Sequence, residues 1–228
     1  SYNQSEMARV EILGVMRGVR IARVTVEPVR YNPSTNQLEV YNDIEVSLTY
    51  ENADWALTQQ TFKSTYSPYY DVAYKPLMNI DDVYDDHPDL LTFPVHMLIV
   101  SDPMFEETLQ PFIEWKTKMG YYLTVVYTDE IGNSTSEIQA WIHDQYNDGV
   151  ADGHAPDFVV FVGDVQQIPA SATGSASGKK TDLYYCSVDG DYFPEIYYGR
   201  MSAQNTTHLE NMLNKIIPYE MYTMDDPT

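Results

Sequence analysis

The stretch VHMLIVSDPMFEETLQPFIEWKTKMGYYLTVVY, residues 95–127, contains a complete strand-helix-strand unit. The apolar run Val95 to Val100 has the length of a buried strand, and Asp102-Pro103 then supplies a helix cap with proline at the first helical position. Apolar residues recur at helical spacing over residues 105–116, before a second strand from Tyr121 to Tyr127. Two strands joined through a helix predict parallel pairing.

The same order continues toward the C-terminus. It comprises a helix opened by the capping box Ser134 and Glu137, strands at Phe158 to Val162, Leu183 to Val188 and Ile196 to Arg200, and a closing helix over residues 209–216. This β-α-β-α-β sequence predicts an α/β subdomain whose mainly parallel sheet is covered by helices on its faces.

The first 50 residues have a different period. Apolar residues alternate with polar ones in two segments, Val19 to Val26 and Ile44 to Tyr50, and turn-forming residues at 31–36 separate them. This pattern predicts an antiparallel β-sheet or small sandwich. Because about 50 residues of strand form a marginal core, we expect this sheet to pack on the second part or on a further N-terminal half.

Periodicity fades over residues 52–94, which hold five tyrosines, four prolines and four aspartates close together. We interpret this segment as a linker that crosses a surface. The chain is therefore predicted to be a two-part α+β protein, with a β-rich part at 1–75, a linker at 76–94 and the α/β subdomain at 95–228.

The net charge of −21 argues against nucleic acid and anionic membrane surfaces as partners. No apolar run approaches the roughly 20 residues of a membrane-spanning helix, so no membrane insertion is expected. Residues 1–50 carry a balance of only −1, with five arginines at positions 9, 17, 20, 23 and 30. We therefore expect these arginines to face carboxylates of the second part, with an attraction that salt would screen.

A candidate metal loop lies at the end of the aromatic run in the segment 181–200. Asp189, Asp191 and Glu195, with the Phe193 carbonyl between them, offer the hard oxygen ligands that Ca²⁺ prefers. A solvated hairpin turn at Asp189-Gly190 explains the same residues without a metal. Asp164, directly after a buried strand, is a weaker candidate that is equally well explained as a turn cap.

The single cysteine, Cys186, invites a nucleophile hypothesis with His143, His154 or His208 as the base. We favour a small core residue instead, because no adjacent cation or helix N-terminus is predicted that would lower the thiol pKa. His143 is interpreted as a surface residue. No GxGxxG, P-loop, HExxH or GxSxG pattern occurs, so nucleotide chemistry and the common hydrolase motifs lack support.

Four segments resemble the first subdomain of the catalytic domain of the gingipains, the C25 cysteine endopeptidases of Bacteroidetes. They read VHMLIVS, FIEWKTKMGYYLTVVYTDE, FVVFVGD and TDLYYCSVDGDYFPEIYYGRMSA. The likeness is closer to the lysine-specific member than to the arginine-specific ones. Residues 1 to about 75 similarly resemble the C-terminal part of the gingipain prodomain.

This resemblance implies a caspase-like fold, a secreted or cell-surface bacterial enzyme, and structural Ca²⁺ on Asp189, Asp191, the Phe193 carbonyl and Glu195. It also implies that the His and Cys dyad lies in a second subdomain after Thr228, so this chain alone is expected to be inactive. The remainder of the catalytic domain and protein substrates are the implied partners. Residues 79–84 lack the basic residue at which the family is processed. The alternative is a non-catalytic module that binds a protein or glycan.

Overall fold

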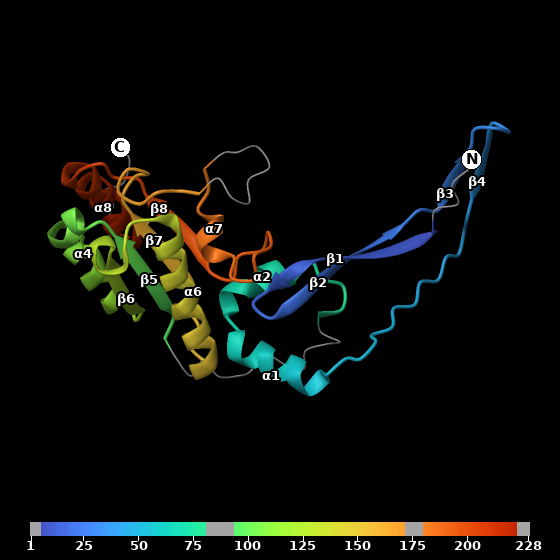
Figure 1. Ribbon diagram of the computed structural model, residues 1–228, viewed down its shortest axis with the longest axis horizontal. Coiled ribbons are helices and arrows are strands. Elements are labelled where there is room, and N and C mark those ends of the chain that lie inside the picture. Colours follow the sequence, from blue (N-terminus) through green and yellow to red (C-terminus); the bar gives the residue numbers. More distant parts are fainter. Residues whose placement is uncertain (1–5, 81–93, 172–179, 223–228) are drawn as a thin grey trace.

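The computed structural model describes residues 6–80, 94–171 and 180–222. We call residues 6–80 the N-terminal part and the described residues from 94 onward the α/β part. The α/β part lies at one end of an elongated molecule, and two β-hairpins extend from it as an arm (Figure 1). Among the helices of these described ranges, none is both long enough and apolar enough to cross a bilayer.

The α/β part is built on a four-stranded parallel sheet with the order β6-β5-β7-β8. Its strands are β5 (His96–Ser101), β6 (Tyr122–Tyr127), β7 (Phe158–Val162) and β8 (Tyr197–Met201). Every residue of β5 is buried, as expected for a strand with neighbours on both sides and helices on both faces. The predicted parallel sheet is confirmed.

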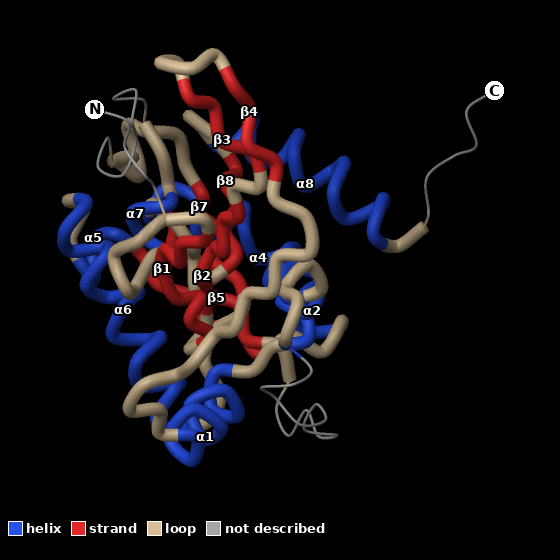
Figure 2. The backbone as a smooth tube through the Cα atoms, turned by 90° about the vertical axis from the view of Figure 1, so that its right-hand side faces the viewer, coloured by secondary structure: helices blue, strands red, loops and turns tan. Residues whose placement is uncertain are grey.

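Helices cover both faces of this sheet (Figure 2). One face packs on α6 (Thr135–Asp152) and the short α7 (Leu183–Cys186), and the other packs on α4 (Glu106–Lys118) and α8 (Thr206–Glu220). The short elements η2 (Pro103–Phe105) and α5 (Thr128–Ile131) follow β5 and β6. The predicted capping box forms, because Ser134 Oγ accepts the Glu137 N–H while the Glu137 carboxylate accepts the Ser134 N–H.

The prediction of a strand at Leu183 to Val188 is wrong. Residues Leu183–Cys186 form the single helical turn α7, in which the Leu183 N–H donates to Thr181 Oγ1 at 3.2 Å. Aromatic residues favour strands on average, but here Tyr185 and Cys186 reach the core from a helical turn packed on α6. Tertiary packing decided the conformation of this segment.

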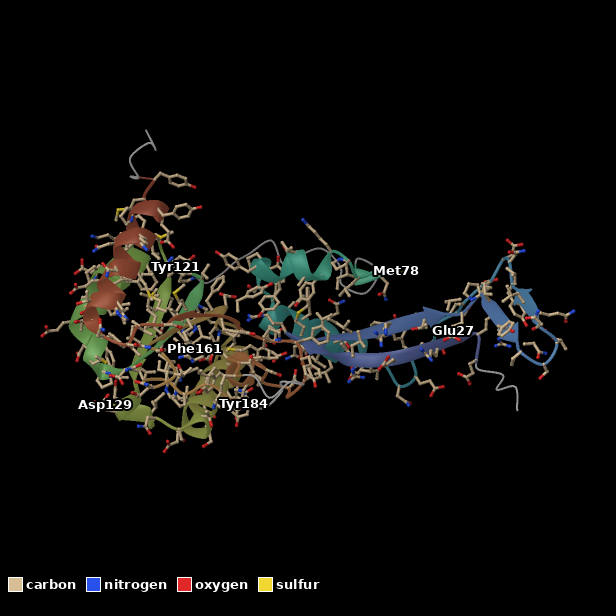
Figure 3. The ribbon with its side chains drawn as sticks, turned by 90° about the horizontal axis from the view of Figure 1, so that it is seen from above. Glu27, Met78, Tyr121, Asp129, Phe161 and Tyr184 are labelled. Atoms are coloured by element: carbon tan, nitrogen blue, oxygen red, sulfur yellow. The ribbon has the colours of Figure 1, made fainter. Side chains whose placement is uncertain are left out.

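The arm consists of two antiparallel hairpins, which confirms the β-rich prediction for the start of the chain. β1 (Ala8–Met16) pairs with β2 (Val19–Val26), and β3 (Val29–Asn32) pairs with β4 (Gln37–Val40). Apolar side chains of both hairpins are exposed, among them Val10, Ile12, Leu38 and Val40. Figure 3 shows the arm reaching away from the α/β part, with Glu27 near the outer end of the first hairpin. The hairpins form separate two-stranded sheets in the described residues, and not one sheet or sandwich.

The predicted strand at Ile44 to Tyr50 is also wrong. Alternating apolar residues are present, but Val46, Leu48 and Tyr50 are exposed, and within the described residues no strand runs beside this segment. A strand requires a hydrogen-bonded neighbour, which an alternating pattern alone does not supply.

Residues 52–80 are not a plain linker. They form α1 (Trp55–Thr65), η1 (Pro68–Tyr70) and α2 (Asp71–Tyr74), with Asp54 capping α1 by accepting the Leu57 N–H. Only Phe62 and Thr65 of α1 are buried, so apolar residues recur only weakly at helical spacing in this part of the sequence. Residues 81–93, with His87 and the acidic cluster that we assigned to the linker, lie outside the described residues.

A small core joins the two parts. It contains Met16, Val19 and Ile21 at the inner end of the first hairpin, together with Phe62, Tyr70 and Tyr74 from the helices below it. Tyr197 of β8 packs against this core, and its ring stacks on Tyr70 with centroids 4.3 Å apart. The hairpin is therefore fixed to the α/β part at its tip.

Candidate functional site

The predicted metal loop lies where the tip of the first hairpin meets the α/β part. Its last acidic residue, Glu195, is 1% exposed. Glu195 Oε2 accepts the Val188 N–H at 2.6 Å, while Oε1 is buried without a hydrogen-bond partner. A buried carboxylate oxygen without a donor is costly, so this oxygen is a candidate ligand for a cation or a site of protonation.

Asp191 connects the loop to the hairpin. Its Oδ1 accepts the Phe193 N–H and its Oδ2 accepts the Val15 N–H of β1, both at 2.7 Å. The approach is so close that a Cβ at Gly14 would collide with the Asp191 carboxylate and the Phe193 ring. Gly14 lies beside a register shift in β1, which lets the strand bend over the loop. The hairpin thus covers the acidic loop.

The loop disfavours negative charge. The pKa of Glu195 is raised from its ordinary 4.5 to about 7, mainly by burial and also by the charges of Asp189 and Asp191, although backbone N–H groups of Val188 and Asp189 oppose the rise. The pKa of Asp189 is raised as well, first by burial and then by Asp191. A bound cation would stabilise the charged forms of Asp189 and Glu195, which burial and neighbouring acidic groups disfavour.

The side chains do not form a closed metal cage by themselves. Within the described ranges, no three His, Cys, Asp or Glu side chains converge closely enough to hold a metal ion. Ca²⁺ takes six to eight oxygen ligands, including backbone carbonyls. A calcium site in this loop therefore needs carbonyl oxygens such as that of Phe193 in addition to Asp189, Asp191 and Glu195.

Arg17, at the hairpin tip, is the central contact between the two parts. It is 1% exposed, and its guanidinium donates to the carbonyls of Thr65, Pro156 and Glu195 at 2.6 to 2.9 Å. Its Nη2 lies 3.6 Å from Asp157 Oδ1. A buried arginine with carbonyl and carboxylate partners satisfies the requirement that buried charge be paired.

The other arginines do not face the α/β part, contrary to our expectation from the charge distribution. Arg9 pairs with Glu27 and Arg23 pairs with Glu11, both within the first hairpin, and Arg30 lies over the ring of Tyr41. Arg20 is exposed. The alternating polar positions of a hairpin bring opposite charges together across its own strands, which accounts for the difference.

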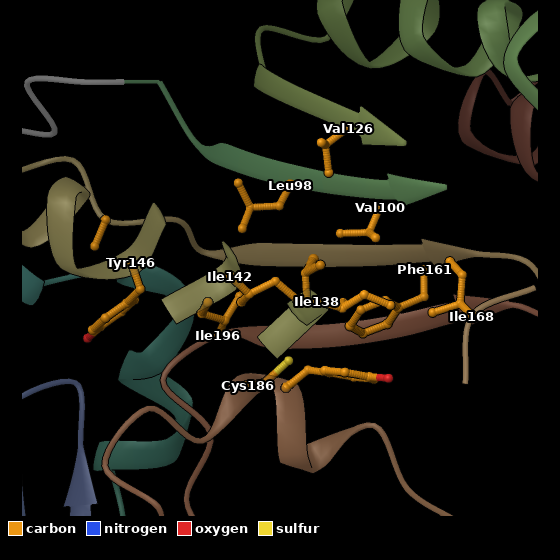
Figure 4. Packing of buried hydrophobic residues seen from close by; sticks show 13 residues of the cluster. Leu98, Val100, Val126, Ile138, Ile142, Tyr146, Phe161, Ile168, Cys186 and Ile196 are labelled. Atoms are coloured by element: carbon orange, nitrogen blue, oxygen red, sulfur yellow. The ribbon is translucent and has the colours of Figure 1, made fainter. Parts of the chain in front are cut away.

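Cys186 is a core residue, as the sequence analysis favoured. Its side chain is completely buried beside Ile196 in the core under α6 (Figure 4). Burial raises the thiol pKa well above its ordinary value, and the neighbouring charges, those of Asp182 and Glu195, raise it too. These surroundings suppress the thiolate that a nucleophile requires.

The candidate bases serve structural roles or lie apart. His143 is half-buried rather than at the surface, because α6 turns it toward the acidic loop, where Asp189 acts on its pKa. Burial nevertheless lowers that pKa overall. His154 Nε2 contacts the Pro94 carbonyl at 2.8 Å, and His208 is exposed in the first turn of α8.

Asp164 is a turn cap. Its Oδ1 accepts the Val165 N–H at 2.9 Å and its Oδ2 accepts the Gln204 amide at 2.7 Å, and these bonds lower its pKa. The interpretation of Asp164 as a turn cap is therefore correct.

The sequence analysis missed Thr65, Asp157, Tyr70 and Tyr146, which surround Arg17. They come from four separate segments, and no local spacing links them. One signal was available: Arg17-Gly18 stands between two alternating apolar segments, which is typical of a hairpin turn.

Comparison with known proteins adds two family matches. The model of peptidase family C25 matches residues 91–227, and the model of the C25 propeptide matches residues 3–86. The Lys-gingipain of Porphyromonas gingivalis is 48% identical over 97% of this chain, and gingipain R2 of the same species is 25% identical over 96%. The chain spans 13% of that Lys-gingipain and 30% of that gingipain R2.

Solved structures give the same result for the fold. A structure described as a protease, 48% identical, superposes with a TM-score of 0.57 and covers 62% of this chain and 31% of its own. The crystal structure of the Arg-specific cysteine proteinase gingipain R, 24% identical, covers 59% of this chain and 30% of its own with a TM-score of 0.50. None of these matches supports a glycan- or protein-binding module.

Proposed function

The chain belongs to peptidase family C25, and we propose that it is a zymogen fragment of a secreted cysteine endopeptidase. In this proposal the N-terminal part is the C-terminal portion of a prodomain, and the α/β part is the first subdomain of the catalytic domain. The observation that carries it is that propeptide and peptidase matches follow one another along a chain whose two parts share a buried interface.

In this proposal Cys186 is not the catalytic nucleophile, and another cysteine of the parent enzyme supplies the thiol. Cys186 is the only cysteine of the 228 residues, and its buried, high-pKa thiol is unsuited to attack on a peptide bond. The remainder of the catalytic domain is therefore the proposed partner of this fragment, and proteins cut after lysine are the proposed substrates of the whole enzyme. The name of the Lys-gingipain relative motivates the choice of lysine over arginine.

Calcium is proposed as a structural ion of the acidic loop. The unpartnered Glu195 Oε1 and the raised pKa values of Asp189 and Glu195 support this assignment. Asp189, Asp191, Glu195 and the Phe193 carbonyl would hold the ion, and its charge would balance theirs. The ion would brace the loop beneath the hairpin and would take no part in the chemistry of peptide cleavage.

The function is tested by comparing two chains. The 228-residue chain should not cleave lysyl or arginyl peptide substrates, whether or not it carries Cys186→Ala. A longer chain that continues the natural sequence past Thr228 should cleave lysyl substrates once the N-terminal part is removed. A downstream sequence without a His and a Cys in an α/β context would refute the proposal, as would activity of the 228-residue chain.

A further inference from the structure

The conformation of Arg17 is unusual for its residue type. Arg17 and Gly18 form the two-residue turn between β1 and β2, and both have positive φ, 47° and 77°. Such turns favour Asn-Gly, because asparagine tolerates the left-handed region better than other residues with a side chain. An arginine at the first position costs backbone energy that its side-chain contacts must offset.

Those contacts surround the guanidinium on its edges and faces. Its N–H groups point to three carbonyls, those of Thr65, Pro156 and Glu195, and to the Asp157 carboxylate. The rings of Tyr70 and Tyr146 lie 5.1 Å and 5.7 Å from the guanidinium carbon. A planar, delocalised cation with five donors fits this combination of in-plane acceptors and stacked rings, whereas a lysine ammonium does not.

Most of this surrounding belongs to the α/β part. Pro156, Asp157, Glu195 and Tyr146 contribute two carbonyls, the carboxylate and one ring, and only Thr65 and Tyr70 come from the N-terminal part. Asp157 is itself held in place, since its Oδ2 accepts the buried His96 N–H at 3.1 Å. The carboxylate of this receptor is thus positioned by β5 of the sheet, independently of the hairpin.

We propose that Tyr146, Pro156, Asp157 and Glu195 form a guanidinium-binding pocket on the α/β part, specific for an arginine side chain. Arg17 fills this pocket in the uncleaved chain and is the main determinant of hairpin docking. The pocket concerns recognition between the two parts, and so goes beyond the peptidase function proposed above. When the N-terminal part leaves, the pocket is open to an arginine of another polypeptide.

Chemical rescue tests the pocket directly in the full 228-residue chain. Arg17→Ala should lower Tm by on the order of 5–10 °C and speed hydrogen exchange of the hairpin tip. Millimolar ethylguanidinium should then raise the Tm of Arg17→Ala by about 2–4 °C and slow that exchange. The same additive should leave the unaltered chain and the exposed-arginine control Arg20→Ala unchanged. Absence of selective rescue would overturn the proposal.

Two milder substitutions separate recognition from turn geometry and from charge. Arg17→Asn supplies the residue that the turn prefers, so a variant as stable as the unaltered chain would show that the pocket contributes nothing. Arg17→Lys keeps the charge and the stem, and we expect a Tm well below that of the unaltered chain. If Arg17→Lys docks the hairpin equally well, the pocket recognises a positive charge and not a guanidinium, and the proposal is wrong.

Discussion

Arg17 and Thr65 exchange two hydrogen bonds of 2.6 Å each. The Arg17 Nε–H donates to the Thr65 carbonyl, and the Thr65 hydroxyl donates to the Arg17 carbonyl. Thr65 ends α1, 48 residues after the hairpin tip. The exchange therefore fixes the hairpin and α1 relative to each other, and both residues are buried where water cannot replace the bonds.

Thr65→Val should destabilise the chain by about 1–2 kcal/mol, since it leaves the buried Arg17 carbonyl without its donor at nearly constant volume. Urea unfolding followed by circular dichroism measures this loss. Thr65→Ser keeps the hydroxyl and should retain most of the stability. Equal losses for both variants would show that loss of the hydroxyl does not by itself account for the effect.

The raised pKa of Glu195 predicts a stability that falls with rising pH. The folded state holds an extra proton between the ordinary value of 4.5 and the folded value of about 7, so the stabilisation present at low pH is lost as pH rises through this window. The loss is up to about 3 kcal/mol. In EDTA, Glu195→Gln should remove this slope, whereas the exposed Glu210→Gln should keep it.

Calcium should raise Tm, because an ion that binds only the folded loop stabilises it. Asp189 has an exposed position in the loop, so Asp189→Asn can remove a ligand without breaking the Asp191 bond to Val15. We expect a smaller calcium shift in Asp189→Asn than in the unaltered chain or in Asp148→Asn on the surface of α6. Equal shifts in all three chains would exclude this loop as the calcium site.

Cys186 should resist alkylation in the folded protein. Its buried thiol has a pKa well above the ordinary value, so iodoacetamide at pH 8 should label it only after unfolding. Mass spectrometry across a urea gradient follows the labelling, which should track the loss of structure. Rapid labelling of the native chain would reopen the nucleophile hypothesis for this residue.

Glu220 neutralises a buried lysine between α4 and α8. Its carboxylate accepts from Lys116 Nζ at 2.7 and 2.9 Å and from Trp115 Nε1 at 2.7 Å. Glu220→Ala leaves both donors unpaired and should cost about 1–3 kcal/mol, with a change in tryptophan emission. Glu210→Ala, an exposed position on the same helix, is the control and should alter neither quantity.

Apart from α7, the α/β part could be predicted from sequence because its signals are local. The cap at Asp102, the capping box at Ser134 and the apolar runs of β5 and β7 each lie within a few residues. The hydrophobic pattern did not predict α1, because only Phe62 and Thr65 of this helix are buried. It wrongly predicted a strand at residues 44–50, because in the described residues no neighbouring strand pairs with this segment.

The candidate functional site shows the same contrast between residues that are close together in the sequence and residues that are far apart. The acidic residues 189, 191 and 195 are close in sequence and could be proposed as a group, and their ion remains a prediction. Arg17 could not be singled out among five arginines, because its partners Thr65, Asp157 and Glu195 are 48 to 178 residues away. Charge composition predicted attraction between the two parts, but the structure concentrates it in one buried residue.

The interface described for Arg17, Val15 and the shared core needs no peptide bond between the two parts. Cutting the chain between residues 75 and 94 would leave each of these contacts intact. It would change only the effective concentration of the hairpin at the α/β part, from that of a tethered segment to that of a free polypeptide. In the zymogen proposed above, the fraction of N-terminal part that stays bound after such a cut would therefore depend on protein concentration.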